Sequence, residues 1–356
     1  MNVEKLKIPS NFQYDHDPLD MAVASIGQCD ALINNSFIDV GLLLSLLMLK
    51  ESETTSRMEG TKITFEDLVL SDEGVGGIGK RSPVEEARGV TYAILEGNKM
   101  LKDGLPISNR FIKAMHRSLM RHAQYENKNV IPGEFRNVNV RVGRYRPPDH
   151  QHVPDLMSYL EQYIHNQEIN ISPLIKVGII HAQFERIHPF ADGNGRIGRL
   201  LISFLLKEYG FTSRVSYFIS PYVEQQKNYY YDGLEFIEYD GGWDRWITTF
   251  LGLVKGSSGN TIRIIEMLNS LYMDGDFLNF HNKNSQHIKN FIFNKPIFTV
   301  SQLKLYLEKQ SVYLSTSGIK NQLNGSDDVT ILRQSKGKSE NVYKCNKIAG
   351  ILTDIS

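Results

Sequence analysis

The sequence has little cysteine, no net charge and no long apolar run. Its two cysteines, Cys29 and Cys345, stand at opposite ends of 356 residues, and two isolated thiols make neither a disulfide framework nor a zinc site. Lysine plus arginine number 40, as do aspartate plus glutamate, so no global field draws the chain to nucleic acid or to an anionic membrane. The longest apolar runs, such as 40–49, are too short to span a bilayer, and the first residues, MNVEKLKIPSNF, lack a signal-peptide core. We therefore expect a cytoplasmic protein without membrane contact.

What is present fits a globular, mainly α protein. Hydrophobic residues make up 41% and charged residues 22%, which argues against wholesale disorder. The length predicts two or three domains. Apolar spacing of helical period recurs in most of the chain, and either Ser108 or Asn109 caps one of these helices. The segments with helical pattern are 1–60, 83–103, 107–122, 154–206 and 223–254.

Two stretches break the helical pattern. Residues 131–148, IPGEFRNVNVRVGRYRPP, show alternating side-chain character and are bounded by Pro-Gly and Pro-Pro. This pattern predicts a short β-hairpin or an extended flap. Residues 255–260, KGSSGN, read as a linker. The remainder, 261–356, shows helix, helix and then paired strands, the order expected of a winged helix. We therefore predict an N-terminal helical region at 1–105, a helical core at 106–254 and a winged-helix-like domain at 261–356.

Three other motifs are weak. Gly74–Gly79 satisfies GxGxxG and begins like a P-loop, but Arg81 stands where Ser or Thr would bind magnesium, so a surface loop is the better interpretation. The loop 149–152, DHQH, offers two histidines without a third metal ligand. His181 lies on one face of a predicted helix, seven residues before His188, and is better read as a packed histidine than as a catalytic one.

The segment 187–199, IHPFADGNGRIGR, carries the densest chemistry. A helix predicted over 173–187 ends at His188, because Pro189 disfavours helical geometry in the residue before it. The glycines of DGNG, 192–195, permit positive φ and turn several backbone N–H groups toward one point, which makes an anion nest. A second helix begins there, and its N-terminus adds about half a positive charge. The segment therefore predicts a phosphate cradle.

Charged side chains complete this cradle. His188, with an ordinary pKa near ~6.5, suits a general base at neutral pH. Asp192 can hold Mg²⁺ against substrate phosphates. Arg196 and Arg199, three residues apart, share a helix face and can grip phosphate oxygens. The alternative, an ordinary helix–loop–helix with a capping asparagine, does not require this combination.

The segment also matches the Fic motif, HxFx(D/E)GNGRxxR, at every fixed position from His188 to Arg199. The flanking stretches HAQFERIHPF, PGEFR (132–136) and SPYVEQQKNYYYDGL resemble the same family, over roughly residues 10–254. The resemblance implies a Fic-type helical core with a short β-hairpin flap, for which a C-terminal winged helix is a frequent companion. It also implies transfer of AMP from Mg·ATP to a Ser, Thr or Tyr hydroxyl of a target protein.

The resemblance assigns a role to each matching residue. It implies that His188 deprotonates the target hydroxyl and that Asp192 binds the metal. Phosphate and nucleotide binding would fall to Gly193, Asn194, Gly195, Arg196 and Arg199, with Asn194 at the α-phosphate and the arginines at the β- and γ-phosphates. Tyr230 and Tyr231 match a pair near the adenine, although core packing explains tyrosines equally well. The flap would align the target backbone by strand addition; its residues are Arg136, Val138, Val140, Val142 and Gly143.

A second element of the same family precedes the core. Thr55, Glu59 and Gly60 fit the inhibitory motif (S/T)xxxE(G/N). The resemblance implies that Glu59 pairs with Arg199 in place of the ATP γ-phosphate. A carboxylate ~4 Å from a phosphate charge costs about 4 kcal/mol at an effective dielectric of ~20, or about a thousandfold in binding. The alternative is that Glu59 is a surface acid at a helix end.

Other functions stay open at this point. Glu59 could instead position a water, which would make the protein a de-adenylylating hydrolase, and another phosphate-containing group could be transferred. A winged-helix DNA-binding regulator is the alternative from a different class. Its recognition segment, STSGIKNQLNGSDD, has one lysine and two aspartates, which weakens DNA binding. The target protein and a homo-oligomeric state are not specified by the sequence.

Overall fold

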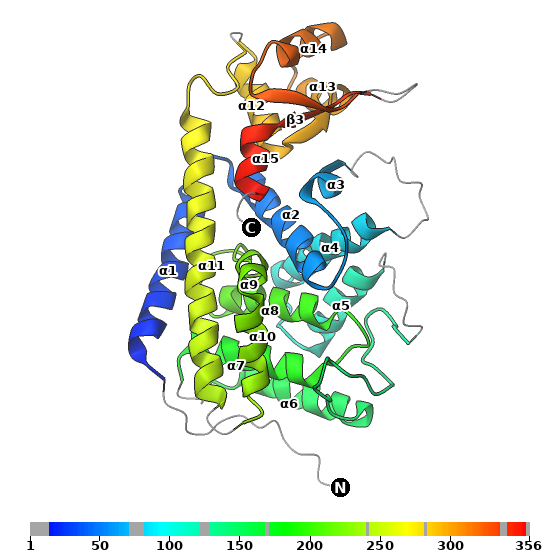
Figure 1. The fold of residues 1–356 in the computed structure, drawn as a ribbon, viewed down its shortest axis with the longest axis vertical. Coiled ribbons are helices and arrows are strands. Elements are labelled where there is room, and N and C mark those ends of the chain that lie inside the picture. The colour runs from blue at the N-terminus through cyan, green and yellow to red at the C-terminus, as the bar shows by residue number, and fades with distance from the viewer. Residues whose placement is uncertain are drawn as a thin grey trace. The chain divides into compact units, whose positions relative to one another are not determined.

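The computed structural model describes residues 14–70, 82–121, 129–167, 171–239, 242–280, 283–334 and 340–353 (Figure 1). The GxGxxG match at 74–79 lies outside these residues. The fold is mainly helical, as predicted, with one small sheet. None of the described helices combines the length and the apolar content that a bilayer span requires.

The helical segments predicted from periodicity are present, and serine side chains cap the starts of some of them. Ser82 accepts a hydrogen bond from the Glu85 N–H and caps α4, and Ser108, not Asn109, does the same for α5 through the Phe111 N–H, both at 3.3 Å. The first helices are α1 (His16–Asn34), α2 (Val40–Met58), α3 (Phe65–Leu70), α4 (Pro83–Lys102), α5 (Asn109–Met120), the 3₁₀ turn η2 (His150–His152) and α6 (Val153–His165). The following ones are α7 (Pro173–Ile187), α8 (Asn194–Glu208), α9 (Ser220–Gln225), α10 (Lys227–Phe236) and α11 (Gly242–Met273).

The predicted linker at 255–260 is wrong, because these residues continue α11 without a break. Their small side chains serve packing rather than flexibility. A Cβ on Gly256 would overlap the ring of Tyr222. Ser258 donates to the carbonyl of Val254 one turn back at 3.1 Å, and Ser257 donates to the carbonyl of Phe218 at 3.1 Å. Glycine and serine here let the Tyr222 ring and the Phe218 backbone lie close to α11. Composition alone does not distinguish such a packed helix from a flexible linker.

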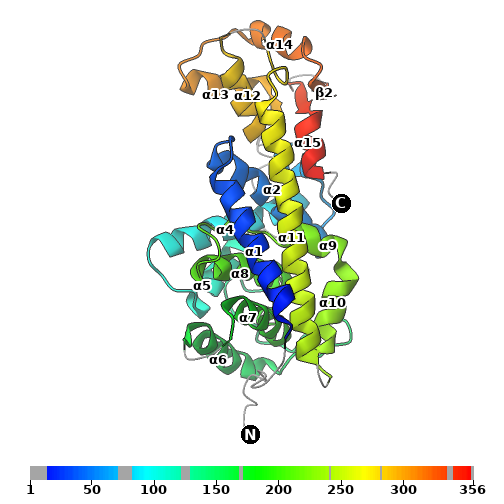
Figure 2. The same cartoon turned by 90° about the vertical axis from the view of Figure 1, so that its left-hand side faces the viewer.

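The described residues divide into two compact units. The first takes 14–31, 51–63 and 82–260, and the second takes 32–50, 64–70 and 261–353. In the first unit α7 and α8 pack against each other and are almost wholly buried, while α4 packs on α5. The N-terminal helix α1 runs alongside α11, where Lys255 Nζ lies 3.4 Å from Met21 Sδ (Figures 1 and 2).

The second unit carries the sheet. Besides α3 and parts of α1, α2 and α11, its elements are α12 (Ser285–Asn294), β1 (Ile297–Thr299), α13 (Val300–Lys309), α14 (Thr316–Asn324), β2 (Val329–Arg333), β3 (Val342–Cys345) and α15 (Asn346–Thr353). The strands are antiparallel in the order β1-β3-β2, with Ile297 opposite Lys344 and Val329 opposite Cys345. Helices followed by paired strands are the order that the sequence predicted, and the winged-helix assignment stays a prediction.

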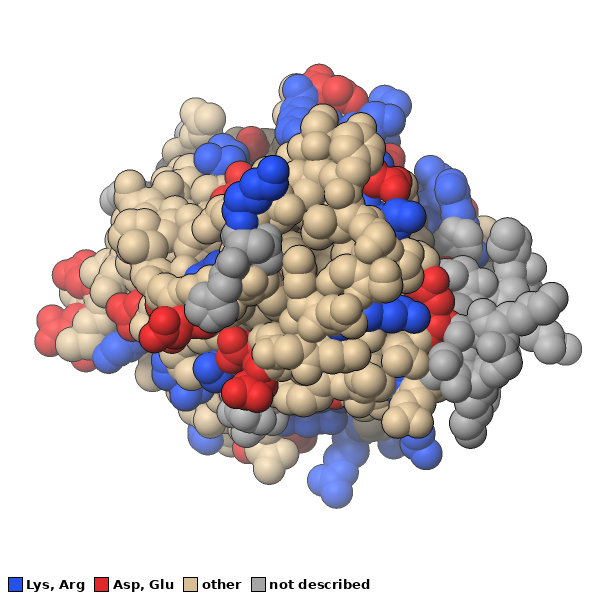
Figure 3. All heavy atoms as spheres, turned by 90° about the horizontal axis from the view of Figure 1, so that it is seen from above, with Lys and Arg blue, Asp and Glu red and all other residues tan. Residues whose placement is uncertain are grey.

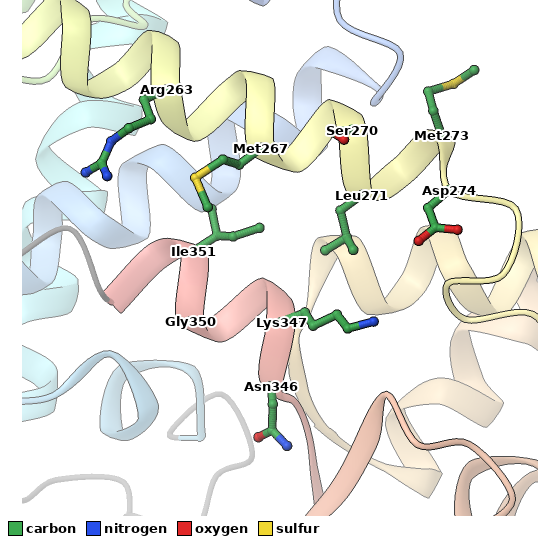
Figure 4. A pocket seen from close by; sticks show the side chains of 10 residues that line it. All are labelled: Arg263, Met267, Ser270, Leu271, Met273, Asp274, Asn346, Lys347, Gly350 and Ile351. Atoms are coloured by element: carbon green, nitrogen blue, oxygen red, sulfur yellow. The ribbon is translucent and has the colours of Figure 1, made fainter.

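The end of the molecule that carries α14 presents charges of both signs. Figure 3 looks onto the end at which Figure 1 labels α14, and there lysines and arginines are interspersed with acidic residues. Elsewhere on the unit, the last turns of α11 and the helix α15 form an open groove of about 1010 Å³. Met267 and Leu271 line it from α11, and Lys347 and Ile351 from α15 (Figure 4).

Candidate active site

The turn between α7 and α8 begins with a strained histidine. His188 caps α7 at φ 49°, in the left-handed region that is rare for non-glycine residues and costs about 1–2 kcal/mol. Pro189 makes continued helix unfavourable, so the chain must leave the helical region here. Strain of this kind persists only when surrounding contacts hold it.

Arg136 supplies those contacts. It is 3% exposed, and its Nε donates to the His188 carbonyl at 2.8 Å, while Nη2 donates to the Ile187 carbonyl at 3.3 Å. Its backbone N–H donates to the Pro189 carbonyl at 2.8 Å. Nη1 and Nη2 also reach the carbonyls of Val138 and Pro148. The arginine of the PGEFR stretch therefore fixes the backbone around His188 rather than facing outward with the flap.

The buried side chain of Asn194 holds the loop after His188. Asn194 is 1% exposed; its Oδ1 accepts from the Phe190 N–H at 2.8 Å and its Nδ2 donates to the Phe190 carbonyl at 2.9 Å. Gly193 adopts φ 81° as the residue before α8. The first N–H groups of α8 have no partner within the helix and therefore form an anion-binding end. The Asn194 side chain therefore shapes this end of α8.

Arg196 lies beneath the loop, between two carboxylates. Its Nη1 donates to Glu86 Oε1 at 2.8 Å, and its Nη2 to Asp192 Oδ1 at 3.2 Å. Asp192 Oδ1 also accepts from the Gly193 N–H at 2.5 Å. Arg196 is 1% exposed, whereas the Asp192 side chain is 39% exposed. Arg196 thus orients Asp192, and Asp192 remains open to solvent.

Arg199 is already occupied by the end of α2. Its Nη2 donates to Glu59 Oε1 at 2.7 Å, and its Nε to Thr55 Oγ1 at 2.9 Å. A Cβ on Gly195 would overlap Glu59 Oε1, so this glycine admits the carboxylate to the helix start. Four of the sequence-predicted residues, two from each of two distant segments of the chain, therefore meet at one point.

The conformation of Gly60 explains why a glycine follows Glu59 in this segment. Gly60 adopts φ 94°. Its N–H donates to the Arg57 carbonyl at 2.9 Å, and the Thr61 N–H donates to the Ser56 carbonyl at 3.0 Å. These two bonds form a Schellman end, in which a left-handed residue follows the helix. Glu59 is the last residue before that turn, which aims its side chain at Arg199.

Burial and charge set the protonation states. Burial lowers the pKa of His188 to about 4, partly offset by its hydrogen bond to the Glu185 carbonyl and by the charges of Glu59 and Asp192. Burial alone would raise the pKa of Glu59, but the Arg199 guanidinium lowers it below its ordinary value. His188 is therefore neutral and Glu59 ionised at neutral pH.

The tautomer of His188 follows from one contact. Its Nδ1 lies 3.3 Å from the Glu185 carbonyl oxygen, and a carbonyl only accepts, so Nδ1 carries the proton. The lone pair then belongs to Nε2. This is the state that a general base requires.

The two tyrosines differ in exposure. Tyr230 is 2% exposed and its hydroxyl lies 2.9 Å from His181 Nε2, while Tyr231 is 41% exposed. His181 Nδ1 lies 3.0 Å from the Gly198 carbonyl, so Nδ1 donates and Nε2 accepts from Tyr230. His181 is thus a packed histidine, as predicted. It ties α10 to the start of α8.

The flap, 136–145, is an extended segment with a single antiparallel bridge between Val142 and Tyr145 instead of a hairpin of two strands. Val138 and Val140 are half-buried, and Val142 is 41% exposed. Gly143 turns the chain at φ 55°. The Tyr145 hydroxyl anchors the flap to the Arg186 carbonyl at 3.1 Å.

Sequence reasoning missed several residues that hold the site. Glu86 of α4 holds Arg196, and His116 of α5 contacts the loop at Asp192. Glu51 and Arg57 of α2 bind α9. Each partner lies tens of residues away in the chain, so no local pattern marks these pairs.

The described residues contain no group of three His, Cys, Asp or Glu side chains able to hold a metal ion by themselves. In the loop 149–152, His150 and Asp149 instead bind Asn139, at 3.1 Å and 2.9 Å. A Mg²⁺ that arrives with a nucleotide needs only one or two protein carboxylates. The exposed carboxylate of Asp192 suits that arrangement.

Comparisons with known proteins find similar sequences and a similar fold. Residues 106–206 match the model of the Fic/DOC family. The protein adenylyltransferase Fic of Drosophila grimshawi is 32% identical over 151 residues, which are 42% of this chain and 29% of that protein. Its counterpart from Drosophila erecta is 31% identical over 147 residues, 41% of this chain and 28% of that protein. The chain therefore spans less than a third of the length of these curated relatives.

Solved structures share the fold over a longer stretch. A Fic family protein from Desulfovibrio desulfuricans G20 superposes with a TM-score of 0.57 at 18% identity, covering 95% of this chain and 98% of that one. Fic-1 from C. elegans superposes with a TM-score of 0.54 at 20% identity, covering 72% and 74%. At these identities the likeness shows the fold alone.

Proposed function

We propose, from the match of residues 106–206 to the Fic/DOC family model, that the chain is an autoinhibited protein adenylyltransferase. It would transfer AMP from ATP to a Ser, Thr or Tyr hydroxyl of a target protein. The observation that carries the proposal is the 2.7 Å contact between Glu59 and Arg199, beside the anion-binding start of α8. The ionised Glu59 carboxylate lies in a site where Arg199 and the N–H groups at the start of α8 favour phosphate.

In this mechanism the neutral His188 takes the proton of the target hydroxyl on Nε2. The hydroxyl oxygen forms a bond to the α-phosphorus while the bond to the departing pyrophosphate breaks. Arg136 keeps His188 in its left-handed conformation, and the N–H groups at the start of α8 stabilise negative charge on the phosphates. Arg199 would bind the terminal phosphate once Glu59 has left.

The chemistry implies a magnesium ion, and Asp192 is the residue that would hold it. Asp192 Oδ1 is oriented by Arg196 and by the Gly193 N–H, and the carboxylate is solvent-accessible. When bound, Mg²⁺ would neutralise phosphate charge and favour release of pyrophosphate. The extended flap would place the target chain beside His188, and the exposed Tyr231 is the better placed of the two tyrosines to contact a nucleotide base.

The test uses ATP labelled on its α-phosphate and a whole-cell lysate. We expect Glu59→Gly to raise protein labelling by about a hundredfold or more, and Glu59→Gly/His188→Ala to abolish it. Glu308→Gln, which removes a surface carboxylate from α13, serves as the matched control and should label like the wild type. Equal labelling by Glu59→Gly and wild type refutes autoinhibition, and labelling by no variant refutes AMP transfer.

A second candidate is favoured by the charge of Glu59. Its ionised carboxylate acts electrostatically on His188, and the same carboxylate could orient a water for attack on a phosphorus. The water would give a proton to His188 Nε2 as its oxygen bonds to phosphorus, the bond from phosphorus to the target oxygen would break, and His188 would pass that proton to the target oxygen. Release of AMP from a pre-labelled target by the wild type, and not by Glu59→Gly, would support this hydrolase.

A further inference from the structure

The inhibitory end of α2 is held by more than Arg199. Arg57 Nε and Nη2 donate to the two carboxylate oxygens of Glu224 in α9, at 3.0 Å and 2.5 Å. The two side chains are 31% and 25% exposed, so this bidentate pair is largely shielded from water. One and a half turns earlier, Glu51 accepts hydrogen bonds from the Ser220 N–H at 3.2 Å and from Ser220 Oγ at 2.5 Å.

We propose that the Arg57–Glu224 pair is a latch that keeps Glu59 at Arg199, so that nucleotide binding must overcome two separate contacts. This inference rests on the proposed function, because it concerns the regulation of the same site. Neither latch residue belongs to the cradle formed by the loop 188–195 and α8. A phosphate therefore competes directly with Glu59 for Arg199, but it does not compete with Glu224 for Arg57.

The two sides of the latch differ in what anchors them. Helix α9 leads directly into α10, where Tyr230 is bound to the buried His181 at 2.9 Å. His181 in turn binds the Gly198 carbonyl of α8 at 3.0 Å. Glu224 is thus carried by the same frame as the cradle. Arg57 stands two residues before Glu59, so the latch fixes the end of α2 against that frame.

The latch sets how often α2 leaves the site unaided. The fraction of molecules able to bind ATP depends on the ratio of released to docked α2. Each contact made only in the docked state lowers that ratio by a further factor. A half-buried bidentate pair is stronger than an exposed one. We therefore expect its loss to raise the released population about threefold to tenfold.

Glu224→Gln is the cleanest variant. Arg57 Nη1 also donates to Glu53 Oε1 of its own helix at 2.8 Å, so removing the Glu224 charge leaves the guanidinium with an acidic neighbour. The design compares wild type, Glu224→Gln, Glu59→Gly and Glu224→Gln/Glu59→Gly, with Glu308→Gln as control. Incorporation of AMP from labelled ATP is measured at a low, fixed ATP concentration.

The proposal predicts an asymmetric result. Glu224→Gln should raise incorporation about threefold to tenfold over wild type, but should change nothing in the Glu59→Gly background, where no carboxylate remains to be held. The latch is overturned if Glu224→Gln labels like wild type. It is equally overturned if the rise is the same in both backgrounds, since Glu224 would then act on catalysis itself.

Hydrogen exchange separates this inference from the proposed function. Backbone amides of 51–61 should exchange faster in Glu224→Gln than in wild type and in Glu308→Gln. If exchange rises while even Glu59→Gly transfers no AMP, the proposed function fails and the latch stands. If Glu59→Gly labels strongly while Glu224→Gln changes neither labelling nor exchange, the function stands and the latch fails.

Discussion

His116 Nε2 lies 3.0 Å from the carbonyl oxygen of Asp192, and its ring lies flat on Phe190 with the ring centroids 3.7 Å apart. Its Nδ1 accepts the Gly133 N–H at 2.9 Å, so Nε2 carries the proton and donates to Asp192. Burial lowers the pKa of His116 to about 3, so this neutral tautomer persists at working pH. One ring therefore joins α5, the turn at Gly133 and the loop of the cradle.

Replacing His116 by phenylalanine should keep the ring contact but lose both hydrogen bonds. The Gly133 N–H and the Asp192 carbonyl would each lose a buried partner, so we expect a loss of about 2–4 kcal/mol in the free energy of unfolding. Urea unfolding measures this, compared with His16→Phe at an exposed position. A midpoint for His116→Phe that matches the control would contradict the bridging role.

The protonation of His188 predicts an unusual pH dependence. A general base works in its neutral form, and burial lowers the pKa of His188 to about 4. The kcat/KM of Glu59→Gly should therefore stay level as the pH falls from about 8 to about 5.5, and fall only nearer pH 4. Because the Glu59 charge raises the pKa of His188, its removal pushes this decline lower still. Initial rates at ATP concentrations below KM test this, and half-loss near pH ~6.5, the ordinary histidine value, would rule it out.

Local chemistry made the core of the site predictable from the sequence. Proline restricts the backbone of the residue before it, and glycine permits positive φ. The end of α7 at His188 and the start of α8 after Gly193 therefore follow from the local sequence. The match to the inhibitory motif predicted that Glu59 pairs with Arg199, and the two side chains meet at 2.7 Å. The helices of the core followed from their apolar spacing.

What the sequence could not supply depends on tertiary contacts. Gly256 reads as part of a linker until Tyr222 is found packed against it. The Asn194 amide binds the Phe190 backbone and so holds the loop, a role that the local sequence does not mark. Arg136 was placed in the flap, yet it binds the carbonyls around His188. Each depends on a partner whose position only the folded chain defines.

Glu51 makes stability depend on pH in a predictable direction. Burial raises the pKa of Glu51 to about 7, from an ordinary value of 4.5. The folded protein therefore binds this proton more tightly than the unfolded chain, and the stabilisation is fully present below pH 4.5 and is lost as the pH rises through about 7. Glu51→Gln mimics the protonated acid, so its advantage over wild type should grow with pH to about 2–4 kcal/mol near pH 8.

Urea unfolding of wild type and Glu51→Gln from about pH 5 to 8 measures that difference. Burial also raises the pKa of Glu185 to about 7, but this contribution is common to both proteins and cancels. A difference in unfolding free energy that stays constant with pH would show that Glu51 does not titrate in this range.

Replacing each of two helical glycines by alanine should change the free energy of unfolding in opposite directions. A Cβ on Gly89 of α4 would overlap the Leu119 carbonyl oxygen of α5, a backbone atom that cannot turn aside, whereas a Cβ on Gly27 of α1 meets nothing within 4 Å. Gly89→Ala must therefore separate α4 from α5, and we expect a loss of about 2–3 kcal/mol or more. Gly27→Ala should gain about 0.5–1 kcal/mol from helix propensity and a less flexible unfolded chain. Thermal and urea unfolding of both variants decide the matter; losses of equal size would mean that the close α4–α5 contact at Gly89 does not exist in solution.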